Sequence, residues 1–389
     1  MSDNTNNTQP LTDEQQLLLD SIREFVWREV SPHVAQRDRD SQCEAADFQS
    51  AFELGLHMLE LPEEYGGSGI DFQTGAMVFE ELGKVDAGYA ITLVSTFVAF
   101  RNVMLAGTGE QARLFADTIA DGGLGCFAIS EPGAGSDAAA IRTSAVRDGD
   151  DYVLNGQKCW ITNGGIADIY LISAKTDPEA GHRGISTFLV EAGREGLSHG
   201  EHEDKMGLRT SNTCDLILND VRVPADHLVG AEGDGFKIAM SGLDVSRPFM
   251  ATIAVGMMQR ALDEATVYAL QREQFGRPVF EFQMVQDILA RMSAKVVACR
   301  ALVQQTMRRV DLGLDVQKDG AITKQFVTDL QQEVVSDAVQ VMGGNGFTKE
   351  YPVEKLMRDA KVFQIMEGTN QIQSVVIARQ LKKEYVSRL

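Results

Sequence analysis

Apolar residues recur at helical spacing along the first third of the chain. Thr12 followed by Gln15 is typical of a capping box at a helix start, and Pro32 is expected to end the first helical pattern. The Gly-rich turn at 65–69 then precedes a second helical stretch. These spacings predict an N-terminal α-helical domain over residues 1–124. The first apolar stripe consists of Leu18, Ile22, Phe25 (or Val26) and Val30.

From about residue 125 the apolar pattern changes to a period of two, which indicates β-strands. Residues 152–154 and 158–161 flank Asn155-Gly156, a turn signal that predicts a β-hairpin. Several short strands in so short a stretch predict a small sandwich or barrel, which we assign to a middle β domain over 125–230. The further strand candidates are 169–174, 185–190 and 214–223.

Long helical patterns return in the last part of the chain. They are rich in Ala, Leu, Met and Gln, and they break only near 276–278 and 313–320. Four antiparallel helices predict a C-terminal four-helix bundle domain over 231–389. Because helices and strands are segregated rather than alternating, the expected fold class is α+β. The predicted helices are 251–274, 282–312, 322–342 and one near 370–385.

Composition limits the possible partners. A chain of 389 residues with 44% hydrophobic and 24% charged residues suits a globular protein of two or three domains. A formal net charge of −20 makes nucleic acid and anionic membrane poor partners. The apolar run 89–100 is too short for a bilayer and stops at Arg101, so we expect a core helix.

The cysteines, the first ten residues and two histidines bear on cellular compartment and metal content. Five scattered cysteines without a CxxC pair favour a reduced, cytoplasmic location. The first ten residues carry no arginine and look like a short polar tail rather than a signal or transit peptide. His199 and His202 are three positions apart beside acids, but no further ligands are apparent, so no metal site is expected.

Three segments could carry chemistry. The loop 130–137, SEPGAGSD, could approach an anion or a flat ring, although a simple turn after a strand explains it equally well. Trp160 and Thr162 could offer a ring surface and a hydroxyl, but a core aromatic and a strand residue are the more common roles. Glu367 follows a second set of Gly-rich loops, whose backbone N–H groups a ligand could approach. The alternative is that Glu367 is an ordinary solvated acid.

Taken together, six segments resemble the acyl-CoA dehydrogenase family, especially its medium- and short-chain branches. They occur in order and at matching spacings over nearly the whole chain, and the helix–strand–helix order agrees with the fold of that family. The segments are SEPGAGSD (130–137), NGQKCWITNGG (155–165), REQFG (272–276), GGNGF (343–347), YPVEKLMRDAK (351–361) and EGTNQIQ (367–373).

The resemblance implies an FAD-dependent α,β-dehydrogenation of an acyl-CoA thioester to a trans-2-enoyl-CoA. In that family a carboxylate removes the pro-R α-proton while the β-hydrogen leaves as hydride to flavin N5. Glu367 matches the catalytic base, whereas the other known position for it holds Ser246. The resemblance also implies that the Glu367 N–H and the ribityl 2′-hydroxyl stabilise the enolate oxygen.

The resemblance further assigns contacts to cofactor and substrate. Thr162 is expected to bond flavin N5, Trp160 to pack beside the ring, and Ser130 to face the pyrimidine edge. The CoA side is matched by Ser136, Asp244, Arg247, Gly368 and Arg379, with a surface salt bridge as the alternative role for Arg247 and Arg379. The remaining FAD positions are Phe127, Ile129, Ser136, Ile161, Arg272, Gln274, Phe275, Phe282, Gln283, Gln340, Gly343, Gly344, Thr369 and Gln371.

Assembly and partners are implied in the same way. Some of the FAD contacts would come from a neighbouring subunit, so at least a dimer is required, and family members are typically homotetramers. Electrons would pass to an electron-transfer flavoprotein. An enoyl-CoA reductase running the reaction backwards, and a non-catalytic flavin- or CoA-binding scaffold, stay open as alternatives.

Arg101 is an unusual charge within the stretch 93–105 that should line the acyl pocket. It could cap a polar substrate tail, but we expect it to point to solvent. Glutaryl-CoA dehydrogenases carry an arginine directly after a tyrosine in this region, whereas Ala90 follows Tyr89 here. The sequence therefore argues against a dicarboxyl-CoA substrate of that type.

Overall fold

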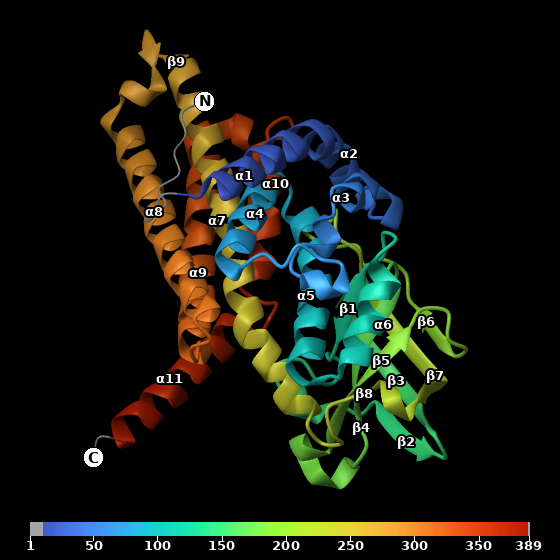
Figure 1. The fold of residues 1–389 in the computed structure, drawn as a ribbon. Helices are drawn as coiled ribbons and strands as arrows, with labels where there is room; N and C mark the ends of the chain where they lie inside the picture. Colours follow the sequence, from blue (N-terminus) through green and yellow to red (C-terminus); the bar gives the residue numbers. More distant parts are fainter. Residues whose placement is uncertain (1–10, 388–389) are drawn as a thin grey trace.

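The structure is a computed structural model that describes residues 11–387. Helices come first, a sheet lies in the middle of the chain, and helices follow again (Figure 1), which confirms the predicted order. The N-terminal helices are α1 (Asp13–Phe25), α2 (Ser31–Asp40), α3 (Gln49–Glu53), α4 (Phe72–Val85), α5 (Ala87–Ala106) and α6 (Gly109–Ile119).

The start of α1 is as predicted, but its end is not. The Thr12 side chain accepts from the Gln15 N–H and the Gln15 side chain accepts from the Thr12 N–H, which confirms the capping box. The prediction that Pro32 ends the pattern is wrong, since a π-turn at Val26–Val30 leads directly into α2. Pro32 lies in the first turn of α2, where a missing N–H costs little, and the wide π-turn accommodates its ring.

The middle of the chain forms an eight-stranded sheet within the described residues. Its order is β6-β7-β3-β2-β4-β5-β8, and β1 pairs in parallel with β4. Most neighbouring strands are antiparallel, and one face buries a separate apolar core. The strands are β1 (Gly125–Ala128), β2 (Ser144–Asp148), β3 (Asp151–Thr162), β4 (Ile169–Lys175), β5 (Ile185–Glu191), β6 (Leu197–His199), β7 (Thr213–Pro224) and β8 (Leu228–Val229).

The predicted hairpin at Asn155-Gly156 is wrong. β3 runs through this dipeptide, and its register with β7 shifts between Leu154 and Gly156. Gly156 is needed because a Cβ there would lie 2.4 Å from the Thr143 hydroxyl. The tight turn instead joins β2 to β3, where Asp148 pairs with Asp151. A glycine in a strand thus marks a close backbone approach rather than a turn.

The C-terminal helices form the predicted bundle with three differences. The first helix begins at 235 rather than 251, because packing on α4 and α5 keeps Pro248 inside a helix. A helix that the sequence pattern did not predict, α10, packs on α7 and α9, and α11 leaves the bundle (Figure 1). The elements are α7 (Gly235–Gln271), β9 (Glu273–Gln274), β10 (Arg277–Pro278), α8 (Gln283–Asp311), α9 (Gln317–Met342), α10 (Val353–Phe363) and α11 (Asn370–Val386).

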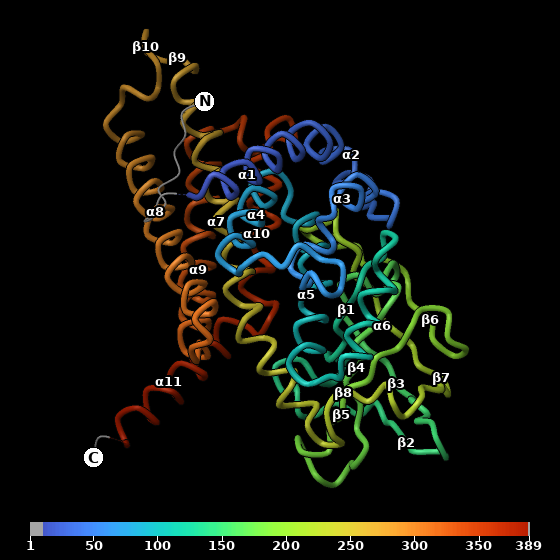
Figure 2. The backbone as a smooth tube through the Cα atoms, viewed as in Figure 1, coloured from blue at the N-terminus to red at the C-terminus, as the bar shows by residue number. Residues whose placement is uncertain are grey.

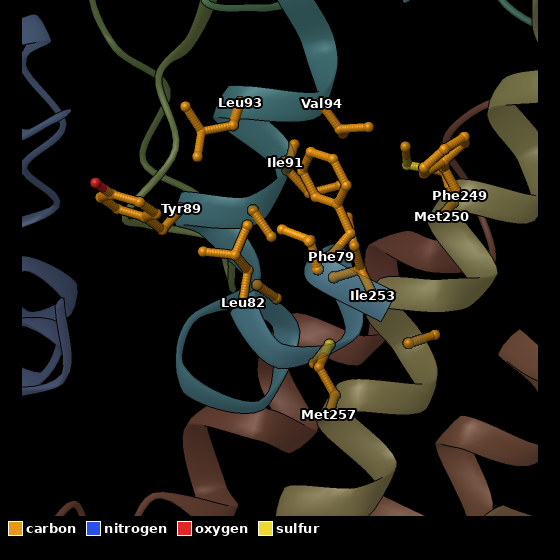
Figure 3. Packing of buried hydrophobic residues seen from close by; sticks show 14 of the residues in the cluster. Phe79, Leu82, Tyr89, Ile91, Leu93, Val94, Phe249, Met250, Ile253 and Met257 are labelled. Carbon is orange, nitrogen blue, oxygen red and sulfur yellow. The ribbon is translucent and has the colours of Figure 1, made fainter. Parts of the chain in front are cut away.

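One hydrophobic core joins the N-terminal helices to the bundle. Phe79 of α4 meets Phe249 of α7 edge-on at 5.8 Å, and Ile253 and residues of α5 pack around them (Figure 3). Glycines allow α4 and α7 to approach closely, since a Cβ on Gly256 would lie 2.2 Å from the Glu80 carbonyl oxygen. This shared core leaves the boundaries at 124/125 and 230/231 as predictions from sequence.

The central helix of this core is α5. Among the described residues, it is the one helix whose length and composition would suit a membrane span. The expectation that the run is too short is therefore wrong, because the helix has 20 residues and continues past Arg101. Its apolar stretch is 78% buried inside the fold, which confirms the predicted core helix.

Candidate functional site

Glu367 lies in the turn between α10 and α11. Its φ is +57°, a left-handed backbone conformation that costs free energy for a non-glycine residue, and Gly368 follows at +85°. Its Oε2 atom is buried and has no hydrogen-bond partner among the described residues. Burial raises the pKa of Glu367, although the positive charges of Arg247, Lys324 and Arg101 act in the opposite direction. The site thus holds a carboxylate with a free lone pair.

Three side chains fix this turn through its carbonyl groups. Gln373 Nε2 donates to the Glu367 and Gly368 carbonyls at 3.1 and 2.8 Å, and Arg247 Nε donates to Glu367 O at 3.4 Å. Lys324 Nζ donates to Gly368 O at 3.0 Å and to Asn370 Oδ1 at 2.7 Å. The strained conformation is therefore held by polar groups that come from α7, α9 and α11.

Sequence reasoning missed Lys324 and the role of Gln373. Both side chains are fully buried, although lysine and glutamine are usually exposed. Lys324 lies at helical spacing from Thr328 and Gln331, so a buried polar stripe on α9 was the signal that could have found it. Burial lowers the pKa of Lys324 to about 7, while the Glu367 carboxylate partly offsets this effect.

Arg247 and Asp244 lie beside the same turn on α7. Arg247 is buried, and its Nη1 donates to Asp244 Oδ1 at 2.5 Å, so the alternative of a surface salt bridge is wrong for Arg247. Ser246 is buried and its hydroxyl donates to the Gly242 carbonyl within α7. Ser246 offers no carboxylate, so Glu367 stays the predicted base, and the CoA role of Arg247 and Asp244 stays a prediction.

The loop 130–137 is held against the sheet by Glu131. Its carboxylate accepts from the Arg142 N–H at 2.6 Å, the Thr143 N–H at 3.0 Å and Lys158 Nζ at 2.7 Å. The Cys159 N–H donates to the Ser130 carbonyl at 3.0 Å. Lys158 is fully buried in β3. This buried ion pair places Ser130 beside the end of β3. The loop 130–137 and the strand end with Trp160 and Thr162 therefore form one surface.

Trp160 is turned out of the sheet by a second irregularity of β3. The register with β7 shifts between Lys158 and Ile161, and Trp160 adopts a φ of +59°. Such bulges redirect side chains next to functional sites. Trp160 is 66% exposed, so the core-aromatic alternative is wrong. Ile161 is buried and packs into the sheet core, and its contact with the cofactor stays a prediction.

Helix α5 joins this sheet edge to α7, the helix that carries Arg247. Asn163 Nδ2 donates to the Thr92 carbonyl at 2.9 Å and to the Gly125 carbonyl at 3.1 Å, which ties the end of β3 to α5 and β1. On its other side α5 packs against α7. The strand end of Trp160 and Thr162 is thus linked through α5 to α7, whose Arg247 bonds the Glu367 turn.

Arg101 does not point to solvent as expected. Its side chain is 10% exposed and forms a two-point ion pair with Glu60, with Nε–Oε2 at 2.8 Å and Nη2–Oε1 at 2.6 Å. Its guanidinium carbon lies 4.1 Å from the centre of the Phe249 ring. The partner in this ion pair is remote in sequence, so no local pattern could have shown the burial.

A third group of candidate residues gathers at the far end of the bundle. The β9–β10 hairpin, the start of α8 and the end of α9 meet there, at a distance from the sheet (Figure 2). Asn345 Nδ2 donates to the Tyr268 hydroxyl at 2.8 Å and joins the Gly-rich loop to α7. Phe275 is 94% exposed. The exposed or half-buried candidates here are Arg272, Gln274, Phe275, Phe282, Gln283, Gln340, Gly343 and Gly344.

Both groups offer open backbone and exposed side chains to a ligand. A Cβ on Gly133, Gly135, Gly343 or Gly344 would meet no atom within 4 Å, so open space adjoins each backbone. Trp160 offers an uncovered ring, and Arg272 an exposed guanidinium. These residues fit an FAD whose two ends are held by different surfaces. No group of three or more His, Cys, Asp or Glu side chains within 11–387 is arranged to hold a metal ion.

The other candidates lie around these surfaces. Ser136 is exposed in the loop 130–137, while Phe127 and Ile129 are half-buried just before it. Thr369 caps α11 by accepting from the Ile372 N–H, and Gln371 is exposed on the first turn of that helix. Arg379 is exposed further along α11. Their contacts with cofactor or substrate stay predictions.

Comparison with known proteins gives matches over nearly the whole chain. Residues 12–123, 126–221 and 233–382 match the acyl-CoA dehydrogenase N-terminal, middle and C-terminal domains. Cyclohex-1-ene-1-carbonyl-CoA dehydrogenase of Syntrophus aciditrophicus is 41% identical and covers 95% of this chain and 90% of its own length.

Two solved structures share the fold. Butyryl-CoA dehydrogenase from Megasphaera elsdenii matches with a TM-score of 0.93 and 40% identity, over 96% of this chain and 100% of its own. A chain from a study of the electron transferring flavoprotein of Acidaminococcus fermentans matches with a TM-score of 0.94 and 42% identity, over 96% of this chain and 99% of its own.

Proposed function

Because the chain belongs to the FAD-binding acyl-CoA dehydrogenase family, we propose that it converts an acyl-CoA thioester to the trans-2-enoyl-CoA, with Glu367 as the base. FAD, when bound, supplies the acceptor for the β-hydride. The observation that carries the proposal is the buried Glu367 Oε2, which has no partner among the described residues. A buried acceptor without a donor is costly unless a ligand faces it.

Glu367 takes the α-proton onto its carboxylate. Burial raises the pKa of this group, which makes it a stronger base than a solvated glutamate, yet it must be deprotonated to act. The rate should therefore fall as the pH is lowered through that raised pKa. The Glu367 N–H is not used in the backbone hydrogen bonds of the turn within 11–387, so it is free to stabilise the enolate oxygen.

Residues from the sheet orient the cofactor. Trp160, turned outward by the β-bulge, would pack beside the flavin ring, and the Thr162 hydroxyl at the strand end would bond N5. Ser130, which the Glu131–Lys158 pair holds against β3, would face the pyrimidine edge. The protein supplies orientation and donors, while the redox chemistry belongs to the cofactor.

The partners proposed are an acyl-CoA, an electron-transfer flavoprotein and further copies of this chain in a homotetramer. The similarity to a chain from a study of an electron transferring flavoprotein supports the electron-transfer flavoprotein as a partner. The separate places of the sheet and of the β9 end of the bundle in Figure 1 support the homotetramer, in which a second copy would supply the missing FAD contacts. The cytoplasm is the proposed location, because all five cysteines are unpaired.

The first experiment is anaerobic titration of the purified yellow protein with saturated acyl-CoAs. Bleaching of the flavin band by one of them is expected, and Glu367→Gln should slow it roughly a hundred- to ten-thousand-fold with FAD retained. Glu195→Gln, an exposed glutamate of the middle domain, is the matched control and should bleach normally.

Other outcomes would contradict parts of the proposal. Flavin that ignores every saturated thioester, but is reoxidised by an enoyl-CoA after chemical reduction, would establish a reductase. Protein that binds no FAD would favour a scaffold. Unchanged bleaching in Glu367→Gln would remove Glu367 as the base.

A further inference from the structure

The loop between β6 and β7 (residues 200–212) packs directly on α10. The Leu208 N–H donates to Asp359 Oδ1 at 2.7 Å. A Cβ on Gly207 would lie 2.5 Å from the Arg358 carbonyl oxygen, so the loop backbone touches the backbone of the helix. Leu208 adopts a φ of +48°, a strained conformation for a residue with a side chain. The contact between this loop and α10 is therefore closely fitted.

Asp359 belongs to a buried charge cluster that also holds α5. Its side chain is fully buried, and its second oxygen, Oδ2, accepts from Lys355 Nζ at 2.6 Å. The same ammonium donates to Asp86 Oδ1 at 2.8 Å. Asp86 is the N-cap of α5, where its side chain accepts from the Gly88 N–H. One pair of charges on α10 thus fixes both the β6–β7 loop and the start of α5.

The other end of the β6–β7 loop holds the strand end that is predicted to meet the flavin. Asn212 accepts through its carbonyl from the Asn163 N–H at 3.0 Å, and through Oδ1 from the Gly165 N–H at 2.9 Å. Thr213, the next residue, pairs with Thr162 in the sheet. Asn163 is also bonded to a carbonyl of α5. Both supports of this strand end, the loop and α5, therefore lead back to the charge cluster on α10.

The same helix leads into the turn of the predicted base. α10 ends at Phe363, and the Met366 N–H donates back to the Val362 carbonyl at 2.9 Å, so the Glu367 turn continues from the helix end. In the proposed reaction the α-proton and the β-hydride leave from neighbouring carbon atoms. The base and the hydride acceptor must therefore keep a fixed separation, and α10 connects the supports of both.

We propose that Asp359 is a positioning residue, which through its bond to Leu208 sets the place of the flavin-binding strand end relative to Glu367. This inference rests on the dehydrogenase function proposed above. Loosening the loop should leave proton removal by Glu367 intact and slow hydride transfer to a displaced flavin. A displacement of about 1 Å, caused far from the reacting atoms, can cost roughly 100-fold in rate.

The test measures proton removal and hydride transfer separately on the flavin-loaded protein. Flavin reduction by the saturated acyl-CoA that bleaches the wild type best requires both steps. Exchange of α-hydrogen with heavy water, in the analogue whose β-carbon is replaced by sulfur, requires only the base, because no β-hydride can leave. Both rates are measured per bound FAD, with FAD in excess, and their ratio is compared between variants.

Gly207→Ala should push the loop away from α10, because its Cβ would meet the backbone of Arg358. Flavin reduction is expected to fall about 10- to 100-fold, while α-hydrogen exchange changes little. Gly200→Ala is the matched control in the same loop. A Cβ at Gly200 would meet the Asp215 side chain at 3.5 Å, an ordinary contact, so neither rate should change.

Asp359→Asn tests the residue itself without adding bulk. The carboxylate accepts with both oxygens, whereas an amide has one acceptor oxygen, so the bond to either Leu208 or Lys355 must be lost. The charged Lys355 is the stronger donor, and Asp86 still balances its charge. The Leu208 bond is therefore expected to break, and flavin reduction should again fall more than α-hydrogen exchange.

Two results would overturn the proposal. One is an equal fall of both rates in Gly207→Ala and Asp359→Asn, which would show a general effect on structure rather than on positioning. The other is flavin reduction at the wild-type rate in both variants. A wild-type flavin that no acyl-CoA reduces would instead remove the dehydrogenase function, and this inference with it.

Discussion

At the scale of single residues, the site depends on buried polar groups with unusual surroundings. Glu367 is placed by a left-handed turn, and the carbonyls of that turn accept from Gln373, Arg247 and Lys324. Lys324 contributes both a hydrogen bond and a charge. These two contributions can be separated by pH, because burial lowers the pKa of Lys324 to about 7.

We predict that Lys324→Met weakens activity most below pH 7. The Lys324 charge lowers the pKa of Glu367, so its removal raises that pKa further and moves the acid limb of the pH–rate profile to higher pH. Above pH 7 the wild-type lysine is largely neutral, so the loss there should be smaller. The free energy of unfolding should fall by about 2 kcal/mol through the lost hydrogen bonds.

The measurement is kcat against pH for the flavin-loaded variant. Lys318→Met on the same helix is the control, since Lys318 pairs with Glu384 away from the turn and should leave the acid limb in place. A uniform loss at every pH in Lys324→Met would show that only the hydrogen bonds matter.

At the scale of elements, the site depends on irregularities of β3. One bulge turns Trp160 outward, and the loop 130–137 is attached beside it by the Glu131–Lys158 pair. Although burial alone would raise the pKa of Glu131, the Lys158 charge and the donors Thr143 and Arg142 outweigh burial and lower it. A carboxyl whose pKa is lowered in the folded state stabilises the fold above its usual pKa, and that stability is lost as the pH falls through the lowered value.

We predict that Glu131→Gln loosens the flavin loop and the fold together. The buried Lys158 would lose its charge partner, which should lower the free energy of unfolding by roughly 3 kcal/mol. Bound flavin per chain should fall with it. Denaturant unfolding and flavin absorbance measure the two effects, and Glu195→Gln should change neither. Full flavin content with unchanged stability would contradict the role given to this pair.

At the scale of the whole molecule, the predicted FAD contacts form two separated surfaces. The sheet edge carries Trp160 and Thr162, and the end of the bundle carries Arg272 and Phe275 (Figure 1). Large apolar side chains are exposed at that end, as at surfaces that associate. They include Phe275, Met284 and Phe347. We propose that an FAD held by both surfaces lies between two copies of the chain.

We predict that two defective variants restore flavin binding when they assemble together. Trp160→Asp damages the sheet surface and Arg272→Glu the bundle surface, so each alone should lose FAD. In a mixed dimer one of the two sites combines both intact surfaces, and random pairing should recover roughly a quarter of the flavin sites. Co-expression followed by a flavin-to-protein ratio measures this. No recovery in a mixture shown to contain mixed oligomers would place the whole site in one chain.

The sequence by itself determined the order of helices and strands, the α+β class and the family. Each of these depends on local periodicity or on motifs, which are contiguous in the chain. Prediction from local sequence was wrong where residues that usually end an element lie inside one. Pro32 and Pro248 lie inside helices, and Asn155-Gly156 lies inside a strand. In each case long-range packing outweighed the local preference of the residue.

Only the tertiary structure decided the surroundings of the candidate residues. Lys324 meets the Glu367 turn across more than 40 positions, and Arg101 meets Glu60 across a similar separation. Burial and pairing of charge depend on which elements pack together, so no spacing in the sequence could predict them. The sequence therefore predicted Glu367 as the base, while the packing of α7 and α9 around it decided its charge environment.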